Sequence, residues 1–148
     1  MSADRSPSRG TAPVPFVDTD VIIRLLTGDD PAKQAAADAL FERVEKGEIT
    51  LAAPDTVIAD AVYVLASPRL YGLPRPEVAA QLSTLVALPA FQVQNRAAVL
   101  AALALYARTS LDFGDALLVA AMQEHGAHVL YSYDSDFDRL AGLDRHEP

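Results

Sequence analysis

The sequence predicts a single α/β domain whose central sheet is mostly parallel and covered by helices on both faces. Short apolar runs that favour strands alternate with pairs of longer segments that have helical periodicity. This alternation is typical of parallel strands joined by helical crossovers. Aspartates stand at the ends of several of these runs, and in such sheets the carboxyl ends of the strands and the adjoining helix starts face one crevice. The crevice is therefore where we expect the functional site.

The composition supports a stably folded domain. Of the 148 residues, 51% are hydrophobic, so the chain can bury a core without disulfides or a structural metal. The absence of cysteine excludes a disulfide framework, thiol catalysis and a zinc–thiolate site. No apolar run reaches membrane-spanning length and the amino terminus has no signal-peptide pattern, so we expect a cytoplasmic protein without membrane contacts.

The net charge of −8 argues against a general affinity for nucleic acid or anionic lipid. It does not exclude nucleic acid as a substrate, because cations held by several carboxylates would change the local field. The charge therefore argues against a binding module more strongly than against a metal-dependent nuclease.

The amino-terminal part of the chain predicts a leader and a first strand. Residues 1–13 are rich in Ser, Pro and Arg and lack periodicity, so we expect a disordered leader followed by one domain over residues 14–148. Residues 14–17 form a short apolar run that predicts a strand. This strand would present Asp18 at its carboxyl end.

Two helices should follow the first strand. Residues 21–26 predict an apolar helix that stops at Gly28 and that Thr19 or Asp20 can cap. Residues 31–46 begin with proline and have apolar side chains at helical spacing, which predicts an amphipathic surface helix.

A second strand and a helix come next. Residues 48–52 predict the strand, and residues 54–65 predict a helix with an apolar stripe. Asp60 lies among the apolar residues of this helix, where aspartate has poor propensity and burial of its charge would be unfavourable. Asp60 therefore either faces solvent or is directed at a site.

The next segment predicts a loop, two helices and a third strand. Residues 67–76 contain three prolines and form a loop, after which residues 77–88 predict a helix. Residues 91–93 predict a short strand, and Asn95 should cap a helix over residues 96–107.

The last helix and strand carry much of the candidate site. Asp112 and Asp115 open a helical pattern that stops near Gly126. Residues 128–131 predict a strand rich in β-forming residues, and an edge strand is expected near Leu143.

Carboxylates from separate chain segments thus stand at junctions between elements. They are Asp18, Asp112, Asp115, Asp134 and Asp136, with Asp60 as a further contributor. Like charges about 4 Å apart repel by roughly 4 kcal/mol at an effective dielectric constant of 20, so their convergence would require counter-ions. Oxygen ligands without cysteine or an organised histidine set favour Mg²⁺ or Mn²⁺ over zinc. Such ions can lower the pKa of bound water and stabilise the charge that develops on a phosphodiester.

Each acid also has a purely structural interpretation. Asp112 can be a helix cap, Asp115 can interact with the helix dipole, and Asp136 can be solvated. Other chemistries find less support, because the sequence has no serine nucleophile elbow, no phosphate-binding glycine loop and no dinucleotide fingerprint. The three histidines lie outside the junctions.

Four segments together resemble PIN-domain proteins of the VapC toxin family, and the resemblance spans residue 14 to about residue 143. The segments are FVDTDVIIRLL with Asp18, APDTVIADAVYVL with Asp60, LDFGDALLVAAM with Asp112 and Asp115, and VLYSYDSDFDRL with Ser132, Asp134 and Asp136. Each motif is weak by itself, but their order and spacing are specific.

The resemblance implies a three-layer α/β/α sandwich and a Mg²⁺- or Mn²⁺-dependent endoribonuclease, the toxin of a type II toxin–antitoxin pair. Asp18 and Asp115 would be the main metal ligands, and Asp60 and Asp134 would complete the catalytic set. Asp136 would assist in metal binding. The supporting residues would be Thr19, Asp20, Asp112 and Ser132.

The resemblance also implies partners: an RNA substrate, a VapB-like antitoxin whose tail blocks the acids, and a second copy in a homodimer formed through helices. The antitoxin groove would involve the helix with Arg24, Leu25 and Leu26 and the helix over residues 35–44.

Two positions depart from the family pattern, and two other interpretations stay open. The family usually has glutamate at the position of Asp60 and asparagine at that of Asp20. The shorter Asp60 is the basis for a PIN-like scaffold that binds RNA or a partner without cutting. Asp18-Thr19-Asp20 after an apolar strand also resembles the nucleophile motif of haloacid-dehalogenase-like phosphatases, although neither lysine stands at the junction that such enzymes require.

Overall fold

The computed structural model describes residues 12–148, so most of the leader expected over residues 1–13 lies outside the described residues. The described part forms six α-helices, one 3₁₀ helix and four short strands. The α-helices are α1 (Thr19–Leu26), α2 (Pro31–Glu45), α3 (Asp55–Ala66), α4 (Arg75–Val86), α5 (Arg96–Arg108) and α6 (Phe113–Glu124). The other elements are β1 (Leu51–Ala53), β2 (Phe91–Val93), β3 (Val129–Tyr131), η1 (Ser135–Arg139) and β4 (Asp144–His146).

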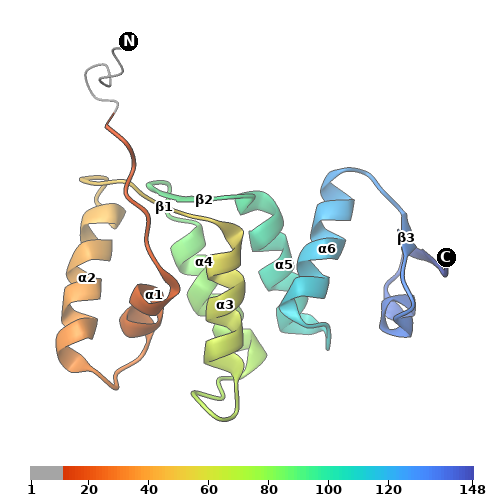
Figure 1. The fold of residues 1–148 in the computed structure, drawn as a ribbon, viewed down its shortest axis with the longest axis horizontal. Coiled ribbons are helices and arrows are strands. Elements are labelled where there is room, and N and C mark those ends of the chain that lie inside the picture. The colour runs from red at the N-terminus through yellow and green to blue at the C-terminus, as the bar shows by residue number, and fades with distance from the viewer. Residues whose placement is uncertain (1–11) are drawn as a thin grey trace.

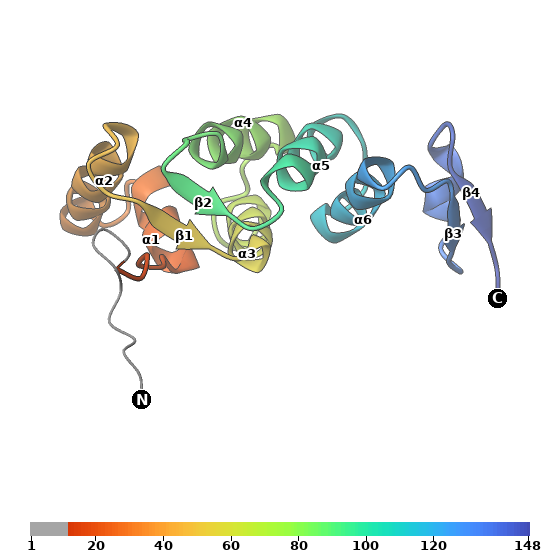
Figure 2. The same cartoon turned by 90° about the horizontal axis from the view of Figure 1, so that it is seen from above.

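The elements follow one another along the long axis of the molecule nearly in chain order. Figure 1 shows α1 and α2 at one end, α3 and α4 in the middle, then α5 and α6, and β3 at the far end. The view from above in Figure 2 gives the same order and places β3 beside β4 beyond α6. The amino-terminal and carboxyl-terminal strands are therefore separated by helices.

The strands pair in parallel, as predicted, but they form two sheets of two strands each. Leu51 of β1 is in register with Phe91 of β2, and Val129 of β3 is in register with Asp144 of β4. The segment predicted as the first strand makes only an isolated parallel bridge from Phe16 to β1. The mixed α/β class with parallel strands is thus confirmed, whereas the described strands do not all join one central sheet.

The chain passes from α6 to the second sheet at Gly126. Gly126 has a φ of +69°, a left-handed conformation that glycine adopts without steric cost, and it ends the helix as predicted. The chain then leaves α6 and forms β3, whose hydrogen-bonded partner is β4 (Figure 2). The edge strand predicted near Leu143 is β4, which starts at the next residue.

The helix boundaries agree with the sequence within a few residues, with two corrections at the caps. Helix α1 begins at Thr19, so neither Thr19 nor Asp20 is its cap, and Asp18 occupies the cap position. Asn95 has a φ of +58° and makes no side-chain cap hydrogen bond to α5. Its amide instead donates to Asp55 Oδ2 at 2.9 Å, because the left-handed backbone turns the side chain toward α3.

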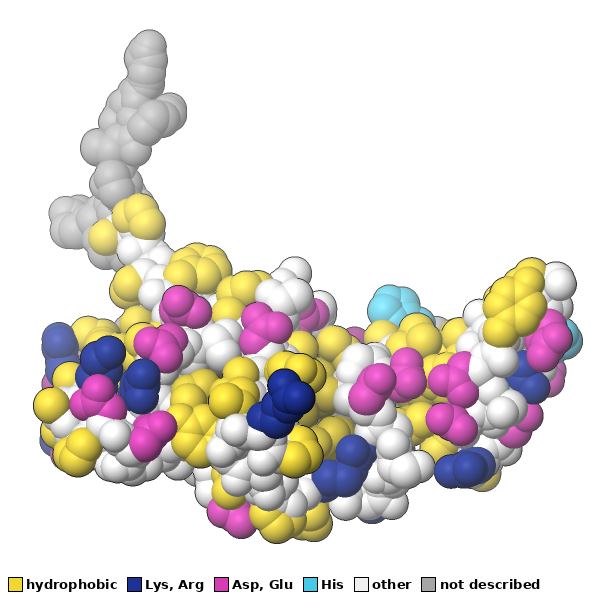
Figure 3. Space-filling view, turned by 60° about the horizontal axis from the view of Figure 1, so that its bottom comes forward, with side chains coloured by type: hydrophobic (Ala, Val, Ile, Leu, Met, Phe, Trp, Pro, Cys, Tyr) yellow, Lys and Arg dark blue, Asp and Glu magenta, His cyan; other side chains and the backbone are white. Residues whose placement is uncertain are grey.

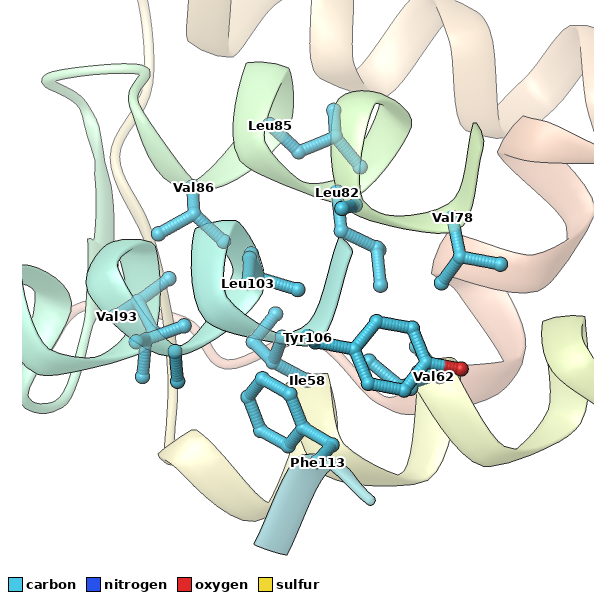
Figure 4. Close-up of a cluster of buried hydrophobic side chains, with 14 of the residues drawn as sticks. Ile58, Val62, Val78, Leu82, Leu85, Val86, Val93, Leu103, Tyr106 and Phe113 are labelled. Carbon is cyan, nitrogen blue, oxygen red and sulfur yellow. The ribbon is translucent and has the colours of Figure 1, made fainter. Parts of the chain in front are cut away.

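The hydrophobic core lies between α1, α3, α4, α5 and the β1–β2 sheet. Figure 4 shows side chains of α3, α4 and α5, among them Ile58, Leu82 and Leu103, packed against one another with Phe113 of α6 at the edge of the cluster. Phe91 packs edge-on against Phe41, with ring centroids 5.4 Å apart. No helix within residues 12–148 has the length and hydropathy that crossing a membrane requires.

Candidate active site

Asp115 is the central residue of an acidic group at the start of α6. Asp112 caps the helix, because its Oδ1 accepts a hydrogen bond from the Asp115 backbone N–H at 2.8 Å. The Asp115 side chain is half-buried, and this burial raises the pKa of its carboxyl group above the ordinary value. The charges of Asp112, Asp134 and Asp136 raise the pKa further, in that order. Carboxylates from α6 and from the turn after β3 therefore lie near one another.

The turn after β3 holds its two acids by short-range hydrogen bonds. The Asp134 side chain caps η1 by accepting a hydrogen bond from the Asp136 backbone N–H at 2.9 Å. Ser132 Oγ accepts from the Asp134 backbone N–H at 3.0 Å. The turn is thus fixed locally, and Asp134 and Asp136 remain exposed.

Asp18 lies at the start of α1, and Asp60 lies on α3. Asp18 occupies the cap position of α1 without a side-chain cap hydrogen bond, and it is exposed. Thr19 Oγ1 donates to the Val57 carbonyl at 3.4 Å, which joins the start of α1 to α3. Asp60 is exposed, whereas its neighbours Ala61 and Val62 are buried, so Asp60 faces solvent. Neither Asp18 nor Asp60 is among the charges that raise the pKa of Asp115.

Asp20 is engaged with a basic residue of its own helix. Its Oδ1 lies 3.7 Å from Arg24 Nε, one turn along α1. Arg24 also donates to Asp29 Oδ1 at 3.4 Å. The partner of Asp20 is therefore a cation of the protein, which partly offsets the charge that aspartate adds at this position.

The structure thus brings together part of the predicted site. Asp112, Asp134 and Asp136 lie near enough to Asp115 for their charges to raise its pKa, and Asp18 and Asp60 are not among these charges. In residues 12–148 no group of three or more His, Asp or Glu side chains lies close enough to hold a metal ion. Carboxylate oxygens are the ligands that Mg²⁺ prefers, so the chemistry of these acids suits a divalent cation, although no three of the described side chains converge on one point.

Sequence reasoning missed Arg75, which supports the start of α6. Arg75 Nε donates to the Tyr106 carbonyl at 2.9 Å, and Nη2 donates to the Leu111 carbonyl. Its guanidinium also lies 3.7 Å from the centroid of the Tyr106 ring. These contacts hold the residue before Asp112 against α5. The only signal in the sequence is an arginine between two prolines, Pro74 and Pro76, at the start of a helix.

A cleft of about 510 Å³ lies beside Asp112, between α3 and the start of α6. Tyr63, Arg75 and Tyr106 line it together with Asp112 and Gly114. Figure 3 shows acidic side chains gathered in a row next to hydrophobic ones on this side of the molecule, with basic side chains in separate places. The cleft combines aromatic and cationic walls with an acidic rim.

Comparisons with known proteins agree with this architecture. The family model of the PIN domain matches residues 16–143, a range that includes every candidate acid. No curated protein matches the chain significantly. PIN domains are typically nucleases, and PIN nucleases generally use divalent metals. The match leaves the phosphatase interpretation without support. That interpretation also requires a lysine in the site, whereas the Nζ of Lys46 lies 3.5 Å from Glu42 Oε2 and forms an ion pair with it. This chain belongs to the PIN-domain family.

Proposed function

We propose that this protein is an endoribonuclease that hydrolyses RNA phosphodiester bonds with Mg²⁺ or Mn²⁺. The observation that carries the proposal is the match of the PIN-domain model to residues 16–143, a range that contains the acids whose charges add to the raised pKa of the half-buried Asp115. A fold keeps such repulsion where the site has a use for it, because functional sites are where perturbed carboxylates concentrate. Asp18, Asp60, Asp115 and Asp134 are the proposed catalytic acids. Asp136 is proposed to join Asp18, Asp115 and Asp134 in binding the metal.

We further propose that the protein is the toxin of a type II pair in the VapC family. Its partner would be a VapB-like antitoxin, and the antitoxin would contact α1 and α2. A cleft of about 300 Å³ between these helices supports this. It is lined by the apolar residues Val21, Ala37 and Leu40, by Lys33, and by Arg24, which is paired with Asp20. A segment with apolar anchors and acidic side chains would match this surface.

Cleavage of RNA in the presence and absence of Mg²⁺ tests the enzymatic proposal. We expect the wild type to cut with Mg²⁺ and to stop when EDTA is added. Asp18→Asn should reduce the rate at least about 100-fold, because removal of one charge-stabilising group in an active site costs roughly 10² to 10³ in rate. Asp38→Asn is the matched control, since Asp38 is an exposed aspartate of α2 and its loss should leave the rate unchanged.

The same experiment separates nuclease from scaffold. RNA bound without Mg²⁺-dependent cleavage, with binding that survives Asp18→Asn, would contradict the enzymatic proposal and favour a non-cleaving scaffold. Copurification of the small protein encoded beside this one tests the antitoxin. The toxin proposal fails if the two do not form a complex.

A further inference from the structure

The cleft between α3 and the start of α6 contains a cation that no acid of the described residues neutralises. Arg75 lines this cleft and is half-buried. None of the ion pairs formed within residues 12–148 includes Arg75. Its Nε and Nη2 donate to the carbonyls of Tyr106 and Leu111, whereas Nη1 donates to none of the described residues. A partly buried charge without a counter-ion is unfavourable, so the cleft favours an anionic ligand.

The guanidinium of Arg75 is already held in place. It lies 3.7 Å from the centroid of the Tyr106 ring, and the two backbone carbonyls fix its plane. Tyr106 is itself buried and packs edge-on against Phe113, with ring centroids 6.4 Å apart (Figure 4). A ligand that binds Arg75 therefore has little side-chain entropy to remove, which favours binding.

An exposed aromatic ring lies at the same cleft, beside the candidate acids. Tyr63 lines the cleft from α3 and is 74% exposed. Asp60 precedes Tyr63 by three residues, so the two side chains share one face of the helix. On the side of α6 the cleft is lined by Asp112, whose Oδ1 accepts from the Asp115 backbone N–H at 2.8 Å. The cleft thus adjoins candidate acids on both helices.

These side chains together match the parts of a nucleotide. Among the described residues that line the cleft, Arg75 is the only cation and Asp112 the only anion. A phosphate matches Arg75, a planar base matches the exposed ring of Tyr63, and the N–H groups of a base can donate to Asp112. The volume of about 510 Å³ lies within the range of roughly 300–1,000 Å³ that small-ligand pockets have.

We propose that this cleft is a subsite for one unpaired nucleotide of the RNA substrate, next to the phosphodiester that is cut. The base stacks on Tyr63 and its phosphate contacts Arg75. The inference rests on the proposed function, because it names how that site holds its substrate. Single-stranded RNA is then the substrate class, since the bases of a duplex are stacked on one another and cannot stack on a side chain.

The affinity for a short fluorescent single-stranded RNA tests the subsite without cleavage. The background is the full-length chain with Asp115→Asn, measured in EDTA so that the RNA stays intact. Tyr63→Ala should weaken binding at least about fivefold, because the loss of one base–aromatic stack costs this much or more. Tyr63→Phe keeps the ring and should bind like the background. Duplex RNA of the same sequence should not distinguish Tyr63→Ala from the background.

Tyr131→Ala is the matched control for the loss of an exposed ring. Tyr131 is 67% exposed, but it lies on β3 and does not line the cleft. Its replacement should leave the affinity for single-stranded RNA unchanged. A stack that is specific to the cleft therefore appears as the difference between Tyr63→Ala and Tyr131→Ala.

The salt dependence of binding tests the phosphate contact. Each phosphate neutralised on a single strand contributes about 0.7 to the slope of log K against log salt concentration. Arg75→Gln should therefore make this slope less steep by about 0.7, whereas Tyr63→Ala should weaken binding without changing the slope. Arg43→Gln is the control, because Arg43 is an exposed cation of α2 whose Nε lies 3.7 Å from Glu48 Oε1, away from the cleft. Its slope should be that of the background.

The subsite is overturned if Tyr63→Ala binds single-stranded RNA no more weakly than Tyr131→Ala, or if Tyr63→Phe is as weak as Tyr63→Ala. An unchanged salt slope for folded Arg75→Gln also overturns it. Melting curves establish whether Arg75→Gln is folded, and the Tyr63 variants decide the proposal if it is not. Loss of binding to a protein partner with unchanged RNA binding would assign the cleft to that partner instead. If the wild type does not cut RNA with Mg²⁺, the proposed function fails, and these affinities still decide the subsite.

Discussion

Asp115 is a residue whose charge opposes the stability of the fold. Its half-buried carboxyl group faces Asp112 on its own helix and Asp134 and Asp136 from the turn after β3, and its pKa is raised by burial first and by these charges second. The folded protein therefore holds the Asp115 proton more tightly than the unfolded chain does. The contribution of this group to stability is most favourable at low pH and is lost as the pH rises through the raised pKa.

This residue yields a prediction about thermal stability in metal-free buffer. Asp115→Asn removes the charge and keeps the shape, so the melting temperature at pH 7 should rise, on the order of 2 °C for a chain of this size. The gain should shrink as the pH falls to about 3, where the wild-type carboxyl is protonated in both states. Melting curves of both proteins across this range check the sign. A lower melting temperature for the variant at pH 7 would contradict the account.

Asp60 is a second residue where local structure allows a clear test. It is exposed on α3, so a longer side chain meets no packed neighbour. Asp60→Glu restores the residue that the family usually has and extends the carboxylate by one methylene. We predict an increase in RNA cleavage of about tenfold, equivalent to roughly 1.4 kcal/mol in activation free energy, because the longer side chain brings its charge nearer to the other acids. The folded stability should be unchanged, and an unchanged or lower cleavage rate would show that reach is not what limits Asp60.

At the scale of elements, Asp29 joins the loop between α1 and α2 to the loop between α3 and α4. Its Oδ2 accepts from the Tyr71 hydroxyl at 2.6 Å, and its Oδ1 accepts from Thr27 Oγ1 at 3.1 Å. The hydrogen bond from Tyr71 is the largest cause of the lowered pKa of Asp29, and Thr27 and Arg24 add to it. Asp29 therefore stabilises the folded protein at pH values above the pKa that it has in the unfolded chain. This stabilisation is lost as the pH falls through the lower pKa that Asp29 has in the folded protein.

This connection predicts a pH-dependent effect of Tyr71→Phe. At pH 7 the variant should melt lower than the wild type by on the order of 2 °C. The difference should decrease as the pH is lowered below the ordinary carboxyl pKa of 3.8. Tyr63→Phe provides the control, since Tyr63 is an exposed tyrosine of α3 and should behave like the wild type at every pH. If the melting temperature of Tyr71→Phe were lower by the same amount at every pH, the loss would not come from the hydrogen bond between Tyr71 and Asp29.

A similar hydrogen-bonded centre holds residues 129–146 together. Arg145 Nε and Nη2 donate to the two oxygens of Asp138 at 2.8 and 3.1 Å, and Nη1 donates to the Ser132 carbonyl at 3.0 Å. The hydrogen bonds from Arg145 lower the pKa of Asp138. The two-point geometry is specific to arginine. This centre fixes the turn that carries Asp134 and Asp136 relative to β4.

At the scale of the whole molecule, sequence periodicity predicted the helices and the parallel pairing but not the grouping of the strands. Proline and glycine marked the start of α2 and the end of α6 well, because their effects on the backbone are local. The partner of β3 is a long-range choice, and a strand of three residues holds little information about it. Sequence reasoning therefore expected one sheet where the described residues form two.

The same limit applies to the candidate site. Asp112 and Asp115 lie one helical turn apart, and Asp134 and Asp136 share one turn, so local spacing was enough to group each pair. Whether Asp18 joins them depends on how the two sheets are placed, which no local pattern encodes. Arg75 was missed for the same reason, because its partners at Tyr106 and Leu111 are distant in the sequence.

The most direct measurement is calorimetric titration of Mn²⁺ into the full-length protein and into Asp115→Asn, with RNA cleavage followed in the same samples. If the acids around Asp115 belong to a metal-dependent nuclease site, the wild type binds Mn²⁺ and cuts RNA, and the variant loses both properties while remaining folded. Cleavage that persists in Asp115→Asn, or a wild type that binds no Mn²⁺, would contradict this assignment.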